Sequence, residues 1–241
     1  MKKLYTIGHS TYNFSYLVER LQKYKIDWVF DVRSTPFSAF APQYNSYNLS
    51  KELPKFGISY FEMGEYFGAR QLDSKYRYCY PEGYLDFGLW CQTVPYQKAK
   101  KGLLNRGITN HNIALMCTEK DPIDCHRTIM ITRDLELDGI ESYHILGNGE
   151  LKTQKELTKD VLNSYLSRKK SSLKKEDHIK GQGTFDLFGS SDEVIFFEDV
   201  AEISEEHFIE QDQLQQIVEA YREINEKIGY RIVNSVRRWI D

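Results

Sequence analysis

The chain lacks the glycine-rich motifs of the common nucleotide-binding folds. Its 241 residues contain neither the G-x-x-x-x-G-K-[ST] spacing of a P-loop nor the G-x-G-x-x-G spacing of a dinucleotide-binding turn. Neither Cys117 nor Cys125 is followed by an arginine six residues on, so the Cys-x5-Arg loop of rhodaneses and cysteine phosphatases is also missing. These absences exclude the protein classes that the three motifs define.

Cysteines and long apolar runs are scarce. The four cysteines show no Cys-x-x-Cys spacing, and no run approaches the length of a membrane span. The N-terminus carries two lysines but no apolar segment of the length that a signal peptide needs. We therefore expect a cytoplasmic protein with reduced thiols and no membrane partner. A net charge of −3 gives no global argument for a nucleic-acid or membrane surface.

Short apolar runs do occur, and they alternate with helical patterns. The runs predict buried strands at Leu4–Ile7, Trp28–Phe30, Ile58–Phe61, Ile113–Met116 and Ser142–Leu146. Thr153-x-x-Glu156 fits a capping box that opens the helix after the last strand. The alternation predicts an α/β fold, a three-layer Rossmann-like domain whose mainly parallel sheet has about five strands or slightly more.

The composition changes after residue 167. Residues 168–180 are polar and basic, whereas residues 181–221 contain eleven Asp and Glu and no Lys or Arg. We therefore predict an α/β domain over 1–167, a polar and acidic, partly disordered linker over 168–206, and a helical appendage over 207–241.

One stretch, His111–Ile131, combines a buried strand, a tight loop and the start of a helix. Cys117 and Glu119 lie where this strand ends, and Cys125, His126 and Arg127 lie in the first helical turn. Other predicted strands also end in polar residues, namely His9, Ser10, Asp31, Arg33, Ser34, Glu62, Glu65 and His144. Because the carboxyl ends of parallel strands share one edge of the sheet, we expect these side chains to form a site there.

The residue types at this edge suggest several roles. Asp31 and Glu119 are candidates for general acid or base, with His9 and His126 assisting. Cys125 follows the loop at a helix N-terminus, which lowers a thiol pKa. It is either a nucleophile or a small buried residue that packs under the sheet.

Three arginines, Arg33, Arg70 and Arg127, could form an anion-binding pocket with the hydroxyl groups of Ser10 and Ser34. The alternative is that Arg33 and Arg127 pair with the strand-end carboxylates and hold the loops in place. The aromatic residues of the loop 66–84 either stack on a base or a sugar, or pack among themselves as a lid.

Zinc ligation by Cys117, Cys125, His126 and His9 lacks the Cys-x-x-Cys or His-x-x-x-His spacing of common zinc sites. We therefore predict no metal and no cofactor.

A series of motifs resembles a known family. In order, they are Thr6-Ile7-Gly8-His9-Ser10, Asp31-Val32-Arg33-Ser34-x-Pro36-x-Ser38, Phe67-Gly68-Ala69-Arg70, Cys117-x-Glu119-x5-Cys125-His126-Arg127 and His144-Ile145. They are similar to the motifs of the Domain of Unknown Function 488 (DUF488) family over roughly residues 1–150. The resemblance implies a compact α/β domain but supplies no reaction. It places the family's motif residues on His9, Asp31, Arg33, Gly68, Arg70, Glu119, Cys125, His126 and Arg127.

The acidic segment contains a second short resemblance. Gln182–Phe188 is similar to the Q-L-D-L-F peptides with which bacterial proteins dock on the replication sliding clamp, although Thr184 and Phe185 replace the usual Gln and Leu. The alternative is an apolar island that folds back on the domain.

Three functional hypotheses follow. The first is an enzyme that acts on an anionic small molecule or nucleotide. The second is a DNA-associated protein, which processes bases or strands or is an accessory factor recruited through Gln182–Phe188. The third is a non-catalytic module that senses a ligand in the same pocket.

Overall fold

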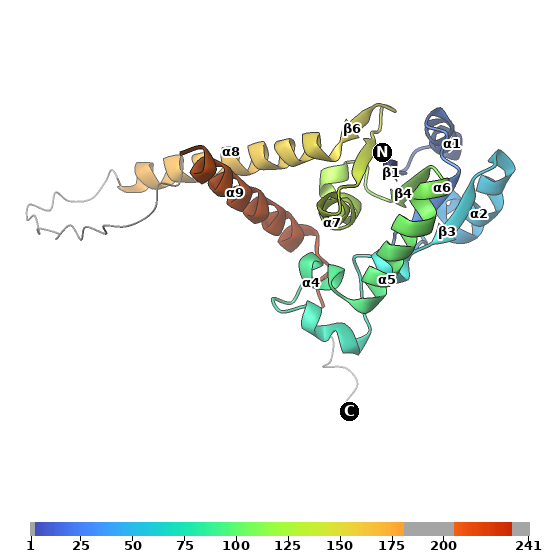
Figure 1. Ribbon diagram of the computed structural model, residues 1–241, viewed down its shortest axis with the longest axis horizontal. Helices are drawn as coiled ribbons and strands as arrows, with labels where there is room; N and C mark the ends of the chain where they lie inside the picture. The colour runs from blue at the N-terminus through green and yellow to red at the C-terminus, as the bar shows by residue number, and fades with distance from the viewer. Residues whose placement is uncertain (1–2, 181–204, 233–241) are drawn as a thin grey trace, which may run out of the picture. The chain divides into compact units, whose positions relative to one another are not determined.

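The computed structural model describes residues 3–180 and 205–232 (Figure 1). Of these, the residues up to Leu157 and those from Arg222 onward form one compact unit, and the residues between Thr158 and Tyr221 form a second. Across the described ranges, no helix combines the length and the apolar character that crossing a bilayer requires. The segment Gln182–Phe188 lies outside the described residues, so the clamp-docking hypothesis stays a prediction.

The first unit is built on a mixed sheet of six strands in the order β3-β2-β4-β1-β5-β6. The strands are β1 (Lys3–Gly8), β2 (Trp28–Asp31), β3 (Ser59–Glu62), β4 (Ile113–Cys117), β5 (Glu141–Ile145) and β6 (Leu151–Thr153). The first five are parallel, and β6 runs antiparallel to β5. The predicted α/β fold with a mainly parallel sheet is confirmed. The short edge strand β6 was not predicted.

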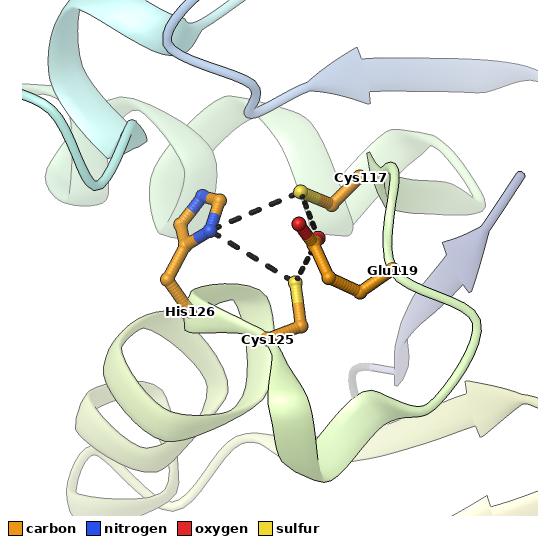
Figure 2. Close-up of side chains that lie close together, drawn as sticks. All are labelled: Cys117, Glu119, Cys125 and His126. Atoms are coloured by element: carbon orange, nitrogen blue, oxygen red, sulfur yellow. Dashed lines mark hydrogen bonds between the residues drawn. The ribbon is translucent and has the colours of Figure 1, made fainter. Parts of the chain in front are cut away.

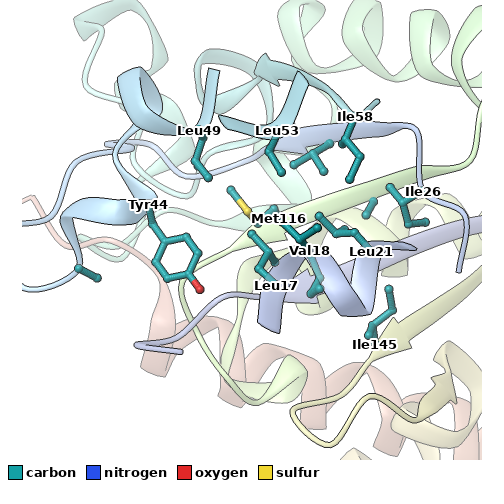
Figure 3. Close-up of a cluster of buried hydrophobic side chains, with 14 residues drawn as sticks. Leu17, Val18, Leu21, Ile26, Tyr44, Leu49, Leu53, Ile58, Met116 and Ile145 are labelled. Atoms are coloured by element: carbon teal, nitrogen blue, oxygen red, sulfur yellow. The ribbon is translucent and has the colours of Figure 1, made fainter. Parts of the chain in front are cut away.

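The helices α1 (Phe14–Lys23) and α2 (Ser46–Glu52) contribute to the main hydrophobic core (Figure 3). Leu17 and Leu21 of α1, at the helical spacing of that segment, are fully buried against Ala114 and Met116 of β4 and their neighbours. Side chains alternate along a strand, so Ala114 and Met116 face this core while Cys117 points to the opposite face.

The face of β4 that points away from this core contacts the segment after Cys125 and His126. That segment forms a π-helical turn, Arg127–Thr132, which continues into α7 (Arg133–Leu137). A π-helical turn is rare and frequently marks a functional site. Here it begins directly after Cys125 and His126.

The remaining helices are α3 (Gly64–Phe67), α4 (Phe87–Cys91), α5 (Val94–Gly102), α6 (Ile108–Asn110), α8 (Gln154–Lys180) and α9 (Glu205–Ile228). The helical pattern of residues 85–106 predicts one helix kinked at Pro95. The structure instead has separate helices α4 and α5, because Pro95 occupies the first turn of α5, where a missing N–H group costs nothing. α8 opens with the predicted capping box: Thr153 N–H donates to Glu156 Oε2 at 2.7 Å, and Glu156 N–H donates to Thr153 Oγ1 at 3.2 Å. α8 also includes residues 168–180, which we had assigned to the linker.

The C-terminal end of α9 completes the first unit. Asn225 Oδ1 accepts from Phe87 N–H at 2.9 Å, and Asn225 Nδ2 donates to the carbonyl oxygen of Leu85 at 2.8 Å. The carbonyl oxygen of Tyr230 accepts from Leu85 N–H at 3.0 Å. Within the second unit, the hydroxyl groups of Thr158 on α8 and Tyr221 on α9 lie 2.9 Å apart.

Candidate functional site

The carboxyl ends of β1 and β4 lie side by side at the centre of the sheet. The chain leaves β1 toward β2 on one side and leaves β4 toward β5 on the other, which makes this boundary a topological switch point. The ladder continues beyond the strands, because His9 N–H donates to the Cys117 carbonyl at 3.0 Å and Ser10 N–H donates to the Thr118 carbonyl at 2.8 Å. The two loops that follow the strands are thereby held together.

Four side chains converge at this point, and we call Cys117, Glu119, Cys125 and His126 the thiol cluster (Figure 2). The thiols of Cys117 and Cys125 donate to the same oxygen, Glu119 Oε2, at 2.8 and 3.0 Å. The same sulfur atoms lie 3.8 and 3.9 Å from His126 Nδ1. All four reactive atoms are within 4.8 Å of one another.

The loop between Glu119 and Cys125 brings the second thiol back to the first. The Asp121 side chain accepts from Ile123 N–H at 3.1 Å, which caps a short 3-10 turn, and Pro122 occupies the first position of that turn. Of the two residues that the sequence offers as a cap for the helix after this loop, Asp121 and Asp124, the structure uses Asp121, and it caps the 3-10 turn. Cys125 and His126 come next, at the entry to the π-helical turn.

A hydrogen bond to the Val32 carbonyl fixes the orientation of the His126 ring. Its Nε2 lies 3.0 Å from the carbonyl oxygen of Val32, an acceptor only, so Nε2 carries the proton and donates. The other ring nitrogen, Nδ1, therefore presents its lone pair to the two sulfur atoms when the ring is neutral.

Burial and charge perturb every member of the cluster. Cys117, Cys125 and His126 are buried, and Glu119 is an exposed residue. Burial raises the pKa of Cys117 well above its usual range. Burial opposes ionisation of Cys125 too, but the adjacent Cys117, the guanidinium of Arg127 and the neighbouring His126 ring outweigh it and lower the pKa of Cys125. Loss of hydration and the charge of Cys125 raise the pKa of Glu119.

Arg127 is 1% exposed and is not paired with a carboxylate in the described ranges. Its Nη1 donates to the backbone carbonyl of Glu119 at 2.9 Å, and its Nε has no hydrogen-bond partner within residues 3–180 and 205–232. The alternative pairing of Arg127 with the Glu119 carboxylate is therefore not formed. A buried guanidinium without an anionic partner is costly, and its charge acts on Cys117 and Cys125 instead.

Arg33, in contrast, is fully engaged. Its Nε donates to Asp31 Oδ1 at 2.8 Å, and its Nη2 donates to Asp31 Oδ2 at 2.5 Å. Its Nη1 lies 3.1 Å from His9 Nε2. Tyr60 also donates to Asp31 Oδ2, at 2.6 Å. For Arg33, the structure forms the ion pair that we weighed as the alternative to anion binding.

The ring of His9 is also held in place by its neighbours. Its Nδ1 lies 2.7 Å from the carbonyl oxygen of Ser10, and its ring stacks on Tyr44. Burial and the nearby Arg33 lower the pKa of His9 to about 4, so the ring is neutral near pH 7. Ser10 has a left-handed backbone with φ of 49°, which is uncommon outside glycine and turns the chain sharply after β1.

Arg70 and Ser34 lie together on neighbouring loops. Ser34 Oγ accepts from Arg70 N–H at 2.9 Å, and the guanidinium of Arg70 lies 4.5 Å from the centre of the Tyr230 ring. Arg70 is exposed. His144 is not part of the site: its two ring nitrogens bond Thr6 and Gln154 at 2.9 Å each.

Sequence reasoning missed Gly8 and the carbonyl of Val32 as site elements. A Cβ atom on Gly8 would lie 1.9 Å from the Glu119 carbonyl oxygen and 3.1 Å from Arg127 Nη2. Only glycine allows the loop of the thiol cluster to approach β1 this closely. The signal in the sequence was a glycine directly before the polar end of a strand.

Comparison with known proteins bears on the same residues. A family model described as "Domain of unknown function DUF488" matches residues 13–133, a range that contains the thiol cluster, Asp31, Arg33 and Arg70. His9 and Ser10 lie just before this range. No curated protein and no solved structure matches the chain. Because the match covers half of its residues, the chain belongs to the DUF488 family, as its motifs predicted.

Proposed function

We propose that the chain is an enzyme that acts on an anionic small molecule or nucleotide at the carboxyl edge of a Rossmann-like sheet. The thiol cluster carries this proposal, because four reactive side chains converge at the switch point with their reactive atoms within 4.8 Å. Burying these polar side chains lowers the stability of the fold relative to apolar side chains in the same place. Side chains with perturbed pKa values gather at functional sites.

Two arginines support a negatively charged substrate. Arg127 places a buried positive charge beside the thiol cluster without a carboxylate to neutralise it among the residues described. Arg70 is exposed and packs on Tyr230, so its guanidinium is within reach of a ligand in solvent. We assign substrate contact to Arg70 and charge stabilisation to Arg127. Arg33 keeps the end of β2 in place through Asp31.

Glu119 is the exposed member of the cluster, and both thiols donate to its carboxylate. A substrate that approaches from solvent therefore meets Glu119 before the buried groups. We assign proton transfer to Glu119, with Cys125 and His126 setting the charge around it. Asp31 and His9 are held by other partners, so we give them a positioning role.

The first test measures binding. Wild-type chain and R70Q are screened by shifts of the unfolding midpoint with inorganic phosphate and nucleoside mono-, di- and triphosphates. We expect at least one anion to stabilise the wild type more than R70Q. If no anion in the panel distinguishes the two chains, the assignment of an anionic substrate is wrong.

The second test measures turnover of the anions that bind, followed by phosphorus NMR. We expect E119Q to lower the rate by about 10²- to 10⁴-fold, as loss of a general acid or base does. The matched control is E19Q, which changes an exposed carboxylate on α1, outside the predicted site. Equal rates for E119Q and wild type would remove Glu119 from the mechanism.

A further inference from the structure

We propose that the thiol cluster is a metal site in which Zn²⁺ is held by Cys117 Sγ, Cys125 Sγ, His126 Nδ1 and a carboxylate oxygen of Glu119. Our prediction of no metal rested on spacing along the chain, since Cys-x-Glu-x5-Cys-His matches no common zinc motif. Convergence in space is a separate criterion, and these four side chains meet it.

The separations between the donor atoms suit a tetrahedral ion. With Zn–S bonds of about 2.3 Å and Zn–N bonds of about 2.0–2.1 Å, a sulfur and a nitrogen ligand lie about 3.6 Å apart. The two sulfur atoms lie 3.8 and 3.9 Å from His126 Nδ1. Glu119 Oε2 is closer to the sulfurs, at 2.8 and 3.0 Å, within hydrogen-bonding distance of both thiols. An ion that replaces the two thiol protons would move this carboxylate away from the sulfurs by about 0.7 Å.

The surroundings of His126 are those of a metal-bound histidine. Such rings almost always donate their second N–H group to a carboxylate, a carbonyl or water, which fixes the orientation of the ligating nitrogen. His126 does this through Nε2 and the Val32 carbonyl, at 3.0 Å (the ring and its contacts to sulfur are drawn in Figure 2).

Arg127 provides an independent argument from charge. Two thiolates, one carboxylate, a neutral imidazole and Zn²⁺ sum to one negative charge. That charge would balance the guanidinium of Arg127, which is 1% exposed, has an Nε without a partner and lacks a carboxylate partner among the described residues. Zinc binding would release the two thiol protons to solvent and give the buried cation its counter-charge.

Glu119 is the ligand that can be exchanged. It is the exposed member of the set, while the other three are buried. A negatively charged oxygen of a substrate could replace the carboxylate without changing the net charge of the centre. This exchange rests on the proposed function, whereas zinc binding itself does not.

The test measures metal content and affinity on the full chain without substrate. The chain is stripped with a chelator, dialysed against buffered zinc and analysed by mass spectrometry. We expect about one zinc per chain. C117S, C125S and H126Q should each lower the zinc affinity by more than about 100-fold. Loss of a residue that only hydrogen-bonds a ligand costs up to about 100-fold, and loss of the ligand itself should cost more. C79S and C91S are the matched controls, since these cysteines are also buried but lie outside the cluster.

A spectroscopic measurement keeps the test independent of variants that fold poorly. Wild-type chain loaded with Co²⁺ should show thiolate-to-cobalt charge transfer and the visible bands of a tetrahedral ion. A wild-type chain that takes up no zinc and shows no such bands would overturn the proposal. So would zinc uptake that C79S or C91S reduces as much as C125S does. Zinc uptake with no turnover of any anion would support the metal site and contradict the proposed function alone.

Discussion

Gly8 is the residue on which the position of the thiol cluster depends most directly. In G8A, the new methyl group would meet the Glu119 carbonyl at 1.9 Å, and that atom belongs to the backbone and cannot rotate away. We expect a loss of about 1–3 kcal/mol in the free energy of unfolding, as for other overpacked sites. Urea denaturation measures this change.

The control for G8A is G102A. Gly102 is the last residue of α5, has helical backbone angles and has no atom near the position of an added Cβ. Alanine there should leave stability unchanged or raise it by up to about 1 kcal/mol. Similar effects of G8A and G102A would mean that the loop can retreat from β1 at no cost.

His144 makes stability depend on pH. Burial, followed by the charge of Arg127, lowers the pKa of this ring to about 3 from an ordinary value of 6.5. Between those two values the unfolded chain binds a proton that the native chain does not, so stability falls as the pH falls. The slope from this group is about 1.4 kcal/mol per pH unit.

The variant H144Q checks this slope, because glutamine does not titrate and can bond Thr6 and Gln154. Urea unfolding between about pH 4 and 6 should show a dependence on pH that is shallower by about 1.4 kcal/mol per unit than in the wild type. A slope that H144Q leaves unchanged would show that the native ring takes up the proton.

At this scale, sequence predicted that the thiol cluster meets, wrongly placed His144 with it, and did not predict which atoms bond. The gathering of Cys117, Glu119, Cys125 and His126 follows from parallel strands and one tight loop. Arg33 and Arg127 carry the same group, yet Arg33 binds a carboxylate and Arg127 binds a carbonyl. That difference depends on where each side chain lies in the fold, which spacing along the chain does not specify.

Among the elements, α8 is the one whose start depends most clearly on a cap. T153A would remove the hydroxyl that accepts from Glu156 N–H at 3.2 Å and donates to its carboxylate at 2.7 Å. We expect a loss of about 0.5–2 kcal/mol in the free energy of unfolding. The comparison variant is S167A, in the exposed interior of the same helix, which should change stability by less than about 0.5 kcal/mol.

The strands were predictable because each is a short apolar run bounded by polar residues. β6 was not, since its three residues, Leu151–Thr153, include only one large apolar side chain. The π-helical turn at Arg127–Thr132 was also not predictable, because its apolar residues fit an ordinary helix equally well.

For the whole molecule, the last described residues are part of the domain that bears the site. N225A would leave Phe87 N–H and the Leu85 carbonyl without their partners. Each unsatisfied buried group costs about 1–3 kcal/mol, so the loss of both partners should lower the free energy of unfolding by about 2–6 kcal/mol and speed amide exchange in residues 83–87. Q215A, at an exposed position of α9, should change neither quantity.

Because residues from Arg222 onward belong to the first unit, a C-terminal deletion does not test the acidic segment alone. Deletion from residue 168 onward would remove Asn225 and Tyr230 together with the acidic segment. The matched family range ends at residue 133, so the contribution of residues 222–232 comes from outside it. Composition marks off the acidic segment but could not show that residues from Arg222 onward belong to the first unit.

All four cysteines are buried, with side chains no more than 7% exposed. An alkylating reagent in solution can therefore reach a thiol only when the chain around it opens. Cys79 and Cys91 lie in the region after β3, while Cys117 and Cys125 lie at the switch point. The order in which the four are alkylated would consequently time the local opening of two regions separately, with no label added to the protein.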